Sequence, residues 1–215
     1  MIELLVKGGL AYLLGSVVGS LIIGRLQGVD IRTMGSGNAG ATNAMRTLGK
    51  KVALVVFGID LLKGWIATAW VAPWAVPEAI AAPPEVAAWS VAVCALAVML
   101  GHVYPLCYGF RGGKGMATLL GVVLGIHAWL VLPMILAWLL TVIASGFVSL
   151  GSMMASAALA ATLAGTRAGI PLVTFGVLSF LLITFTHRSN IARMRSGTES
   201  RARRLWLFGT RRGRA

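Results

Sequence analysis

Long apolar stretches separated by shorter polar connections dominate the 215-residue chain. Three stretches are well delimited and two are longer than the rest: residues 4–23, 52–71, 89–100, 116–146 and 153–185. About 20 apolar residues are enough for an α-helix to cross a bilayer. The pattern therefore predicts an all-α polytopic membrane protein.

The cations between the stretches predict its orientation. The connection over residues 24–51 holds five Lys or Arg residues, whereas residues 72–88 hold none. Because cytoplasmic connections carry the excess of Lys and Arg, we expect the first connection inside and the N-terminus outside. The tail after His187 contains nine arginines, so the C-terminus is also expected on the cytoplasmic side.

The number of spans depends on the last two stretches. An even number of crossings must separate residues 115 and 187 if both lie inside. Two crossings would each exceed 30 residues, so four crossings fit better. Breaks are expected at residues 125–127, near Pro133 and at residues 165–171, where Arg167 would be costly at a bilayer centre. We expect a bundle of about seven transmembrane helices, with five as the fallback.

One transmembrane domain is expected over residues 1–200, followed by an Arg-rich cytoplasmic tail over residues 201–215. The first stretch is longer than the apolar region of a signal peptide and lacks a convincing cleavage site. We therefore interpret it as a retained span. With seven spans, the turn expected at Ser149 and Ser152 lies inside; with five it lies outside.

The distribution of the charges and the spacing of the two cysteines argue against nucleic-acid binding and against a metal site. The chain is 58% hydrophobic, and its net charge of +13 would suggest nucleic-acid binding in a soluble protein. Here the cations lie between apolar stretches, so no nucleic-acid partner is expected. Cys94 and Cys107 have no metal-ligand spacing and are expected to be small core residues.

The most informative polar segment covers residues 35–46 and reads Gly-Ser-Gly-Asn-Ala-Gly-Ala-Thr-Asn-Ala-Met-Arg. Its glycines let backbone N–H groups approach an anion closely and adopt positive φ. Arg46 adds a planar fork for phosphate oxygens. Other side chains add donors: Ser36, Asn38, Thr42 and Asn43. The segment favours phosphate binding.

A second polar segment lies between two apolar stretches. Residues 101–105 read Gly-His-Val-Tyr-Pro, and residues 110–115 read Phe-Arg-Gly-Gly-Lys-Gly. The glycines and the following helix N-terminus resemble a nest for an anion, with Lys114 as a point charge. The spacing of a Walker A loop is absent. The alternative is an ordinary interface loop with a snorkelling lysine.

Two further pairs have a spacing of three and share a helix face. His187 could move protons near neutral pH, and Asn190 could donate to an oxyanion. Alternatively, His187 only complements a helix C-terminus. Asp60 and Lys63 lie within the second stretch, where we interpret them as a packing pair, with a proton or ion path as the alternative.

Missing motifs exclude several enzyme classes. The chain has no grouping of metal ligands, no Gly-x-Ser-x-Gly elbow and no aspartate-rich phosphotransferase signature. None of its three histidines is followed by an aspartate five residues later, which excludes the common acyl-CoA-type glycerolipid acyltransferases.

The combined motifs resemble the bacterial acyl-phosphate-dependent glycerol-3-phosphate acyltransferase family. They are Gly-Ser-Gly-Asn-x-Gly-Ala-Thr-Asn-x-x-Arg at 35–46, Gly-His-x-x-Pro with Gly-Gly-Lys-Gly at 101–115, Ser-Leu-Gly-Ser at 149–152, and His-x-x-Asn-Ile-x-Arg with Gly-Thr-Glu at 187–199. Order, spacing and hydropathy agree over nearly the whole chain. The tail beyond Glu199 is longer than the family needs and is assigned no catalytic part.

This resemblance implies a multi-pass enzyme of the bacterial cytoplasmic (inner) membrane with its active site on the cytoplasmic face. It implies acyl transfer from acyl phosphate to the 1-hydroxyl of glycerol 3-phosphate, giving lysophosphatidic acid and phosphate in the first acylation of phospholipid synthesis. Neither acyl-CoA, metal nor another cofactor is implied. The expected partners are the two substrates and membrane lipids, with no obligate protein partner.

The resemblance also implies residue roles, with direct transfer favoured over an acyl-enzyme. The base is either His187 or a phosphate oxygen of the substrates. The expected catalytic residues are Ser36, Arg46, Lys114, His187 and Asn190. The expected substrate-binding residues are Ser36, Asn38, Thr42, Asn43, Arg46, His102, Gly112, Gly113, Lys114, Gly115, Ser149, Ser152 and Glu199.

Two other classes stay open at this point. A transporter for a phosphorylated metabolite would use the same basic mouth, but no matching pair of broken helices indicates inverted repeats. A structural scaffold would leave residues 35–46 unexplained.

Overall fold

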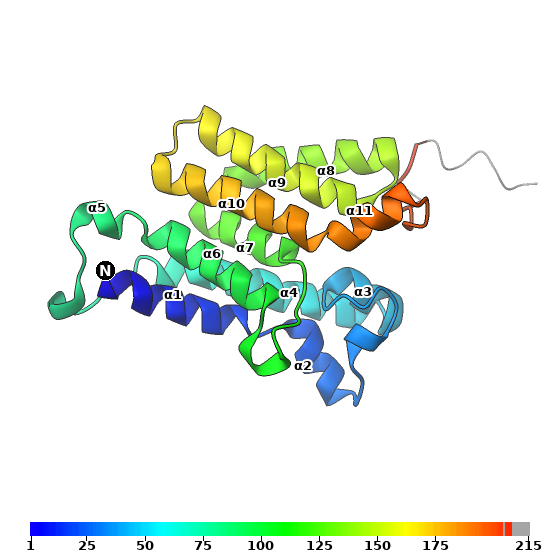
Figure 1. Ribbon diagram of the computed structural model, residues 1–215, viewed down its shortest axis with the longest axis horizontal. Helices are drawn as coiled ribbons and strands as arrows, with labels where there is room; N and C mark the ends of the chain where they lie inside the picture. The colour runs from blue at the N-terminus through cyan, green and yellow to red at the C-terminus, as the bar shows by residue number, and fades with distance from the viewer. Residues whose placement is uncertain (204, 208–215) are drawn as a thin grey trace, which may run out of the picture. The chain divides into compact units, whose positions relative to one another are not determined.

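The computed structural model describes residues 1–203 and 205–207, in which helices are joined by turns and no strand occurs (Figure 1). This confirms the predicted all-α class. The chain divides into two compact units, Met1–Ala128 and Trp129–Ala215. We call them unit 1 and unit 2. A single domain over residues 1–200 stays a prediction.

Unit 1 is built from helix pairs. Its helices are α1 (Ile2–Gly15), α2 (Gly19–Leu26), α3 (Ala41–Thr47), α4 (Lys50–Ile66), α5 (Pro84–Ala87), α6 (Ser90–Val103) and α7 (Met116–Ile126). Short turns add η1 (Ile31–Thr33), η2 (Ala67–Val71), η3 (Glu78–Ile80) and η4 (Leu106–Tyr108). Helix α1 packs along α6, α4 packs on α7, and α3 packs on α4 (Figure 1).

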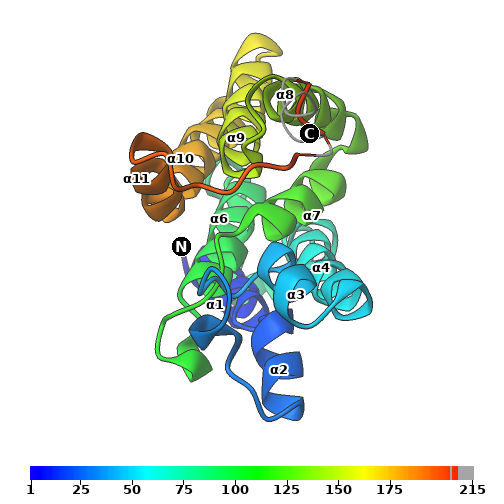
Figure 2. The same ribbon diagram turned by 90° about the vertical axis from the view of Figure 1, so that its right-hand side faces the viewer.

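Unit 2 contains three helices that pack side by side and a fourth that continues the third after a 54° bend. After η5 (Ala128–Leu130), it contains α8 (Val131–Ser145), α9 (Val148–Gly165), α10 (Ile170–Thr186) and α11 (Arg188–Arg195). Helix α8 packs on α9, and α9 packs on α10 (Figure 2). Short connections therefore place α8, α9 and α10 beside their neighbours in sequence.

Four described segments are long and apolar enough to cross a membrane: Lys50–Val71, Pro84–Tyr108, Ala128–Ser145 and Val148–Gly165. Two bent helix pairs, α1 with α2 and α10 with α11, raise the number to as many as six. The apolar helix α7 has only 11 residues. A count of seven spans requires α7 to cross as well, so this count and the orientation of the termini stay predictions.

The helix boundaries confirm two expected breaks and correct a third. Helix α7 ends at Ile126, and the connection after α9 covers residues 166–169, as expected. No break occurs near Pro133, which lies in the first turn of α8, where a missing N–H is tolerated.

Two other sequence-based expectations were wrong, and one stays open. Within the first stretch, α1 and α2 meet at a 42° bend, so the retained span expected there stays a prediction. Ser149 and Ser152 lie within α9 rather than in a turn. Cys94 is buried as expected, but Cys107 is exposed.

Candidate active site

The segment predicted to bind phosphate, residues 35–46, contributes to a small core in unit 1. Val18, Leu21, Ile31 and Ala44 pack together there, and Ala39 belongs to the same buried cluster. Gly35 and Gly37 have φ values of 56° and 71°, so both need the left-handed freedom of glycine. The expected positive φ of this segment is confirmed.

Asn43 holds the segment in shape. Its Nδ2 donates to the carbonyl oxygens of Ile31 and Met34 at 3.1 and 3.0 Å, and its Oδ1 accepts from the N–H of Ser36 at 2.9 Å. Only 1% of Asn43 is exposed. These contacts indicate that Asn43 positions the segment; its predicted contact with substrate stays a prediction.

The predicted anion-binding side chains of this segment face outward. Ser36 and Thr42 are exposed, Asn38 is half-buried, and Arg46 is exposed in the last turn of α3. The backbone around Ser36 is therefore fixed from behind by Asn43, while the hydroxyl-bearing side chain lies at the surface.

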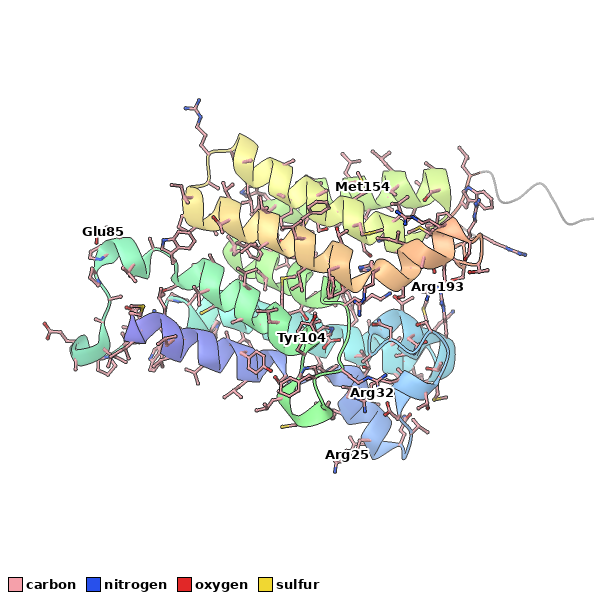
Figure 3. The ribbon with its side chains drawn as sticks, in the orientation of Figure 1. Arg25, Arg32, Glu85, Tyr104, Met154 and Arg193 are labelled. Carbon is pink, nitrogen blue, oxygen red and sulfur yellow. The ribbon has the colours of Figure 1, made fainter. Side chains whose placement is uncertain are left out.

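Arg32 ties the residues just before this segment to the second polar segment. Arg32 Nη2 lies 2.8 Å from Asp30 Oδ2, and Arg32 Nη1 donates to the carbonyl oxygens of Tyr108 and Arg111 at 2.8 and 3.2 Å. Figure 3 labels Arg32 in the lower part of unit 1. The Arg32 guanidinium holds the pKa of the Asp30 carboxyl below its usual range.

The second segment is less open than the predicted nest. The N–H groups of Gly112 and Gly113 donate to the carbonyl oxygens of Val103 and His102 at 3.0 and 3.1 Å. Those two donors are therefore used within the protein, contrary to the expectation that the nest's N–H groups surround an anion. Gly115, at φ 87°, precedes the first residue of α7, and Lys114, which is half-buried, lies between Gly113 and Gly115.

Gly113 brings the two predicted phosphate-binding segments together. A Cβ atom at Gly113 would collide with the His102 ring, and it would lie 2.6 Å from the carbonyl oxygen of Ala39. Only a residue without a side chain permits this approach. The backbone before Lys114 therefore touches the backbone of residues 35–46.

Behind Gly113, His102 belongs to a buried ionic cluster with Asp60 and Lys63. His102 Nδ1 lies 2.8 Å from Lys63 Nζ and 3.3 Å from Asp60 Oδ1, and Lys63 Nζ lies 3.0 Å from the same carboxylate oxygen. All three residues are at most 3% exposed. The predicted Asp60–Lys63 pairing is confirmed, and His102 is placed behind the loop rather than at the surface.

Lys63 also provides hydrogen-bond donors at the break between α1 and α2. Its ammonium donates to the carbonyl oxygens of Gly15 and Val17, each at 2.8 Å. A helix that ends within an apolar span leaves carbonyl groups that water cannot reach, so they need a partner from the protein. These contacts support the packing role of the pair over the alternative of an ion path.

In unit 2, Glu199 gathers side chains from two helices. Its Oε1 accepts from Ser149 Oγ at 2.9 Å and from Asn190 Nδ2 at 2.6 Å. Its Oε2 accepts from Arg193 Nε at 2.7 Å, and Arg193 is labelled on α11 in Figure 3. Glu199 thus joins the N-terminal end of α9 to α11. The sequence analysis included Arg193 in the motif at 187–199 but gave it no role, although its spacing of three from Asn190 places both on one face.

The electrostatics of Glu199 favour the carboxylate. Partial burial raises its pKa, but the hydrogen bonds from Asn190, Arg193 and Ser149 outweigh this effect, and the pKa lies below its ordinary value. An ionised Glu199 accepts all three hydrogen bonds at once. Its contacts indicate that it orients Asn190 and Ser149.

His187 lies at the junction of α10 and α11 with a defined tautomer. Its Nδ1 is 2.7 Å from the carbonyl oxygen of Ile183. Because a carbonyl oxygen can only accept, Nδ1 carries the hydrogen, and Nε2 is the basic nitrogen of the neutral ring. The residue is 4% exposed, and α10 and α11 meet here at a 54° bend.

The remaining predicted residue of unit 2 has a local partner. Ser152 Oγ donates to the carbonyl oxygen of Val148 at 3.1 Å, within the first turns of α9. Among the described residues, no group of three or more His, Cys, Asp or Glu side chains could hold a metal ion.

The catalytic and substrate-binding roles assigned to residues of both units from the sequence stay predictions.

Comparisons with known proteins agree with this architecture. A family model for glycerol-3-phosphate acyltransferases matches residues 6–197. The glycerol-3-phosphate acyltransferase of Geotalea daltonii is 43% identical over 190 residues, which cover 88% of this chain and 93% of the relative. The corresponding protein of Aquifex aeolicus is 41% identical over 194 residues, covering 89% of this chain and 95% of the relative.

Solved structures show the same similarity. The crystal structure of PlsY (YgiH), an integral membrane glycerol 3-phosphate acyltransferase, in its glycerol 3-phosphate form has a TM-score of 0.81 and 36% identity, and the match covers 92% of this chain and 94% of that chain. Its lysophosphatidic acid form has a TM-score of 0.78 and 35% identity, with the same coverage.

The apolar helices and these similarities define an integral membrane acyltransferase. More particularly, the chain belongs to the glycerol-3-phosphate acyltransferase family. The family resemblance predicted from residues 35–46 and 101–115 is confirmed. Family membership identifies an enzyme and therefore decides against the transporter that the sequence left open.

Proposed function

We propose that this enzyme takes its acyl group from acyl phosphate and transfers it to the 1-hydroxyl of glycerol 3-phosphate, giving lysophosphatidic acid and inorganic phosphate. The observation that carries the proposal is the contact of Gly113 with Ala39, which sets the two glycine-rich segments side by side. Each segment carries a cation, Arg46 or Lys114. Two phosphate-bearing substrates need two such sites.

Binding follows from the chemistry of the two segments. Arg46 and Ser36 hold the phosphate of glycerol 3-phosphate, Arg46 as a bidentate fork and Ser36 as a donor. Lys114 balances the charge of both anions, and Gly112, Gly113 and Gly115 shape the pocket for the acyl phosphate. The proposed location is the cytoplasmic face of the bacterial inner membrane, where cations concentrate between the apolar stretches.

The reaction is a direct displacement at an activated carbonyl. The substrate hydroxyl oxygen attacks the carbonyl carbon of acyl phosphate, the new C–O ester bond forms, and the bond from that carbon to the phosphate oxygen breaks. The hydroxyl proton passes to His187 Nε2 or to a phosphate oxygen, and phosphate leaves with the bonding electron pair. No covalent enzyme intermediate is needed, because the leaving group is already a stable anion.

Catalysis then depends on positioning and on charge. Holding two anions together with the hydroxyl aligned to the carbonyl removes a large entropic barrier. A donor at the carbonyl oxygen stabilises the tetrahedral oxyanion, and Asn190, oriented by Glu199, is the candidate for this donor. The acid that fixes Asn190 is therefore part of the proposed mechanism as a positioning residue.

Purified protein in a neutral detergent tests the proposal. With palmitoyl phosphate and glycerol 3-phosphate, we expect lysophosphatidic acid and inorganic phosphate in equal amounts. Palmitoyl-CoA in place of palmitoyl phosphate should give no product; product formation from palmitoyl-CoA alone would reject the proposed donor. A stable acyl adduct formed from palmitoyl phosphate without glycerol 3-phosphate would reject direct transfer.

A further inference from the structure

A pocket of about 740 Å³ opens in unit 1, apart from the residues assigned to catalysis. Its lining includes three arginines, Arg25, Arg32 and Arg111, and one acid, Asp30. The apolar part of the lining includes Leu21. Ser36, Arg46 and Lys114 do not line it. The pocket is therefore a separate cationic site.

Its charge is only partly balanced from within. Asp30 is paired with Arg32, whose Nη1 is also bonded to the carbonyl oxygens of Tyr108 and Arg111. Arg25 and Arg111 are exposed, and no ion pair to either occurs among the described residues. Figure 3 shows Arg25 projecting from the end of α2. The pocket thus presents two cations to an incoming anion.

The pocket lies where apolar segments end. Arg25 is in the last turn of α2, which closes a bent candidate span, and Tyr108 is the last residue of the candidate span Pro84–Tyr108. The ends of membrane-spanning segments lie at the level of the lipid headgroups. Two separate parts of the chain therefore place the pocket at the membrane–water boundary.

Each of the two outward cations has a large apolar neighbour that is also exposed. Leu26, which follows Arg25, is 81% exposed, and Phe110, which precedes Arg111, is 54% exposed. Phe110 has a φ of 57°, a conformation that a bulky residue rarely adopts, and its N–H is bonded to the carbonyl oxygen of Pro105 at 3.1 Å. The loop thus holds an aromatic ring outward beside a cation, an arrangement suited to an amphiphile with a phosphate head.

We propose that this pocket binds an anionic glycerophospholipid of the surrounding membrane, with Arg25 and Arg111 contacting its phosphate and Leu26 and Phe110 contacting its acyl chains. The site is distinct from the proposed acyl-transfer site and does not depend on the identity of the acyl donor. Its ligand remains in the membrane, which explains why apolar side chains flank the cations.

Cys107 provides a built-in probe, because it lines the pocket and is exposed, whereas Cys94 is buried. We would measure the rate at which an uncharged, water-soluble maleimide labels the full chain in neutral detergent. Phosphatidylglycerol, added in increasing mole fraction, should slow labelling of Cys107 in a saturable manner. Phosphatidylcholine, which has no net charge, should not slow it.

Two variants that each lose two positive charges distinguish specific binding in the pocket from a general effect of the protein's positive charge. In R25Q/R111Q, the phosphatidylglycerol fraction needed for half-protection should rise about fivefold or more per arginine, since one such cation near a membrane contributes about 1 kcal/mol. In K50Q/K51Q, whose lysines lie outside the pocket at the start of α4, protection should be unchanged.

Three results would overturn the proposal: no protection of wild-type Cys107 by phosphatidylglycerol, equal loss of protection in both variants, or unchanged protection in R25Q/R111Q. Protection by inorganic phosphate or glycerol phosphate as strong as that by the lipid would identify a soluble-phosphate site instead. The wild-type comparison needs no substitution, so it decides the matter even if R25Q/R111Q fails to fold.

Discussion

Asn190 donates a 2.6 Å hydrogen bond to Glu199, and the carboxylate oxygen that accepts it also accepts from Ser149. A polar group on α11 is therefore held in register with the start of α9 by one acid. Because a hydrogen bond to an ionised group contributes about 1.5–3 kcal/mol, the loss of this charge should affect both stability and the orientation of Asn190.

Glu199→Gln is expected to lower turnover by about tenfold or more, which corresponds to about 1.4 kcal/mol of transition-state stabilisation. The amide keeps the size of the side chain, but one carboxylate oxygen becomes an NH2 group that only donates, so the side chain can no longer accept from Asn190, Ser149 and Arg193 together. Initial rates at saturating substrate measure the effect. The matched control is Glu78→Gln, because Glu78 is an exposed acid in η3. A Glu199→Gln rate equal to that of the control would contradict the positioning role.

The stability that Glu199 contributes should depend on pH with a definite sign. Its pKa in the folded protein is lowered from the ordinary value of 4.5, so the contribution is complete above about pH 4.5 and is lost as the pH falls toward the lower folded pKa. Melting temperatures of wild type and Glu199→Gln should therefore differ most at neutral pH and converge below about pH 4.5. A difference that widened on acidification would contradict the lowered pKa.

Gly113→Ala is expected to reduce activity strongly, because the added methyl group collides with the His102 ring and crowds the Ala39 carbonyl. The change should raise the KM for both substrates as the two segments separate. Gly58→Ala is the control, since a Cβ atom there meets no atom within 4 Å in α4. Measurement of KM and kcat for both variants checks this. Normal kinetics in Gly113→Ala would show that the close approach has no functional importance.

Asp60 and Lys63 should show strong coupling in a double-mutant cycle. Removing one partner of a buried ion pair leaves an uncompensated charge and costs about 3–5 kcal/mol, whereas removing both is far less costly. We expect Asp60→Leu and Lys63→Met each to lower the free energy of unfolding by that amount. The double variant should recover part of it, though not the bonds from Lys63 to Gly15 and Val17. Additive losses would contradict the pairing.

The sequence predicted the helical class, the family and most of the helix boundaries because these depend on local composition. Apolar stretches of sufficient length define helices, and the Gly- and Pro-containing connection over residues 165–171 interrupts the pattern where α9 ends. The spacing of Asp60 and Lys63 also predicted their pairing, since residues three apart share a helix face.

Other features depend on contacts between distant residues and could not be predicted from spacing. His102 joins Asp60 and Lys63 from a different helix, and Asn43 turns inward to the carbonyls of Ile31 and Met34 instead of facing outward with Ser36. The bend between α1 and α2 was also missed, because an apolar pattern alone does not show that Lys63 will satisfy the broken turn.

Arg46→Ala and Lys114→Ala are each expected to lower acyl transfer about a hundredfold or more, equivalent to about 2.7 kcal/mol. Each cation is proposed to bind a phosphate group of a substrate, and an alanine carries no charge that could do so. Steady-state rates of phosphate release measure the loss. Lys50→Ala, which removes an exposed cation at the start of α4, is the control. Near-normal turnover in either Arg46→Ala or Lys114→Ala would contradict the assignment of two anion sites.

Isothermal titration calorimetry on the detergent-solubilised protein tests the central claim most directly. The wild type should bind glycerol 3-phosphate and a non-hydrolysable acyl phosphonate, and each ligand should still bind when the other is saturating. Arg46→Ala should weaken the first ligand in particular. If neither ligand bound, or if each excluded the other completely, two neighbouring anion sites would be contradicted.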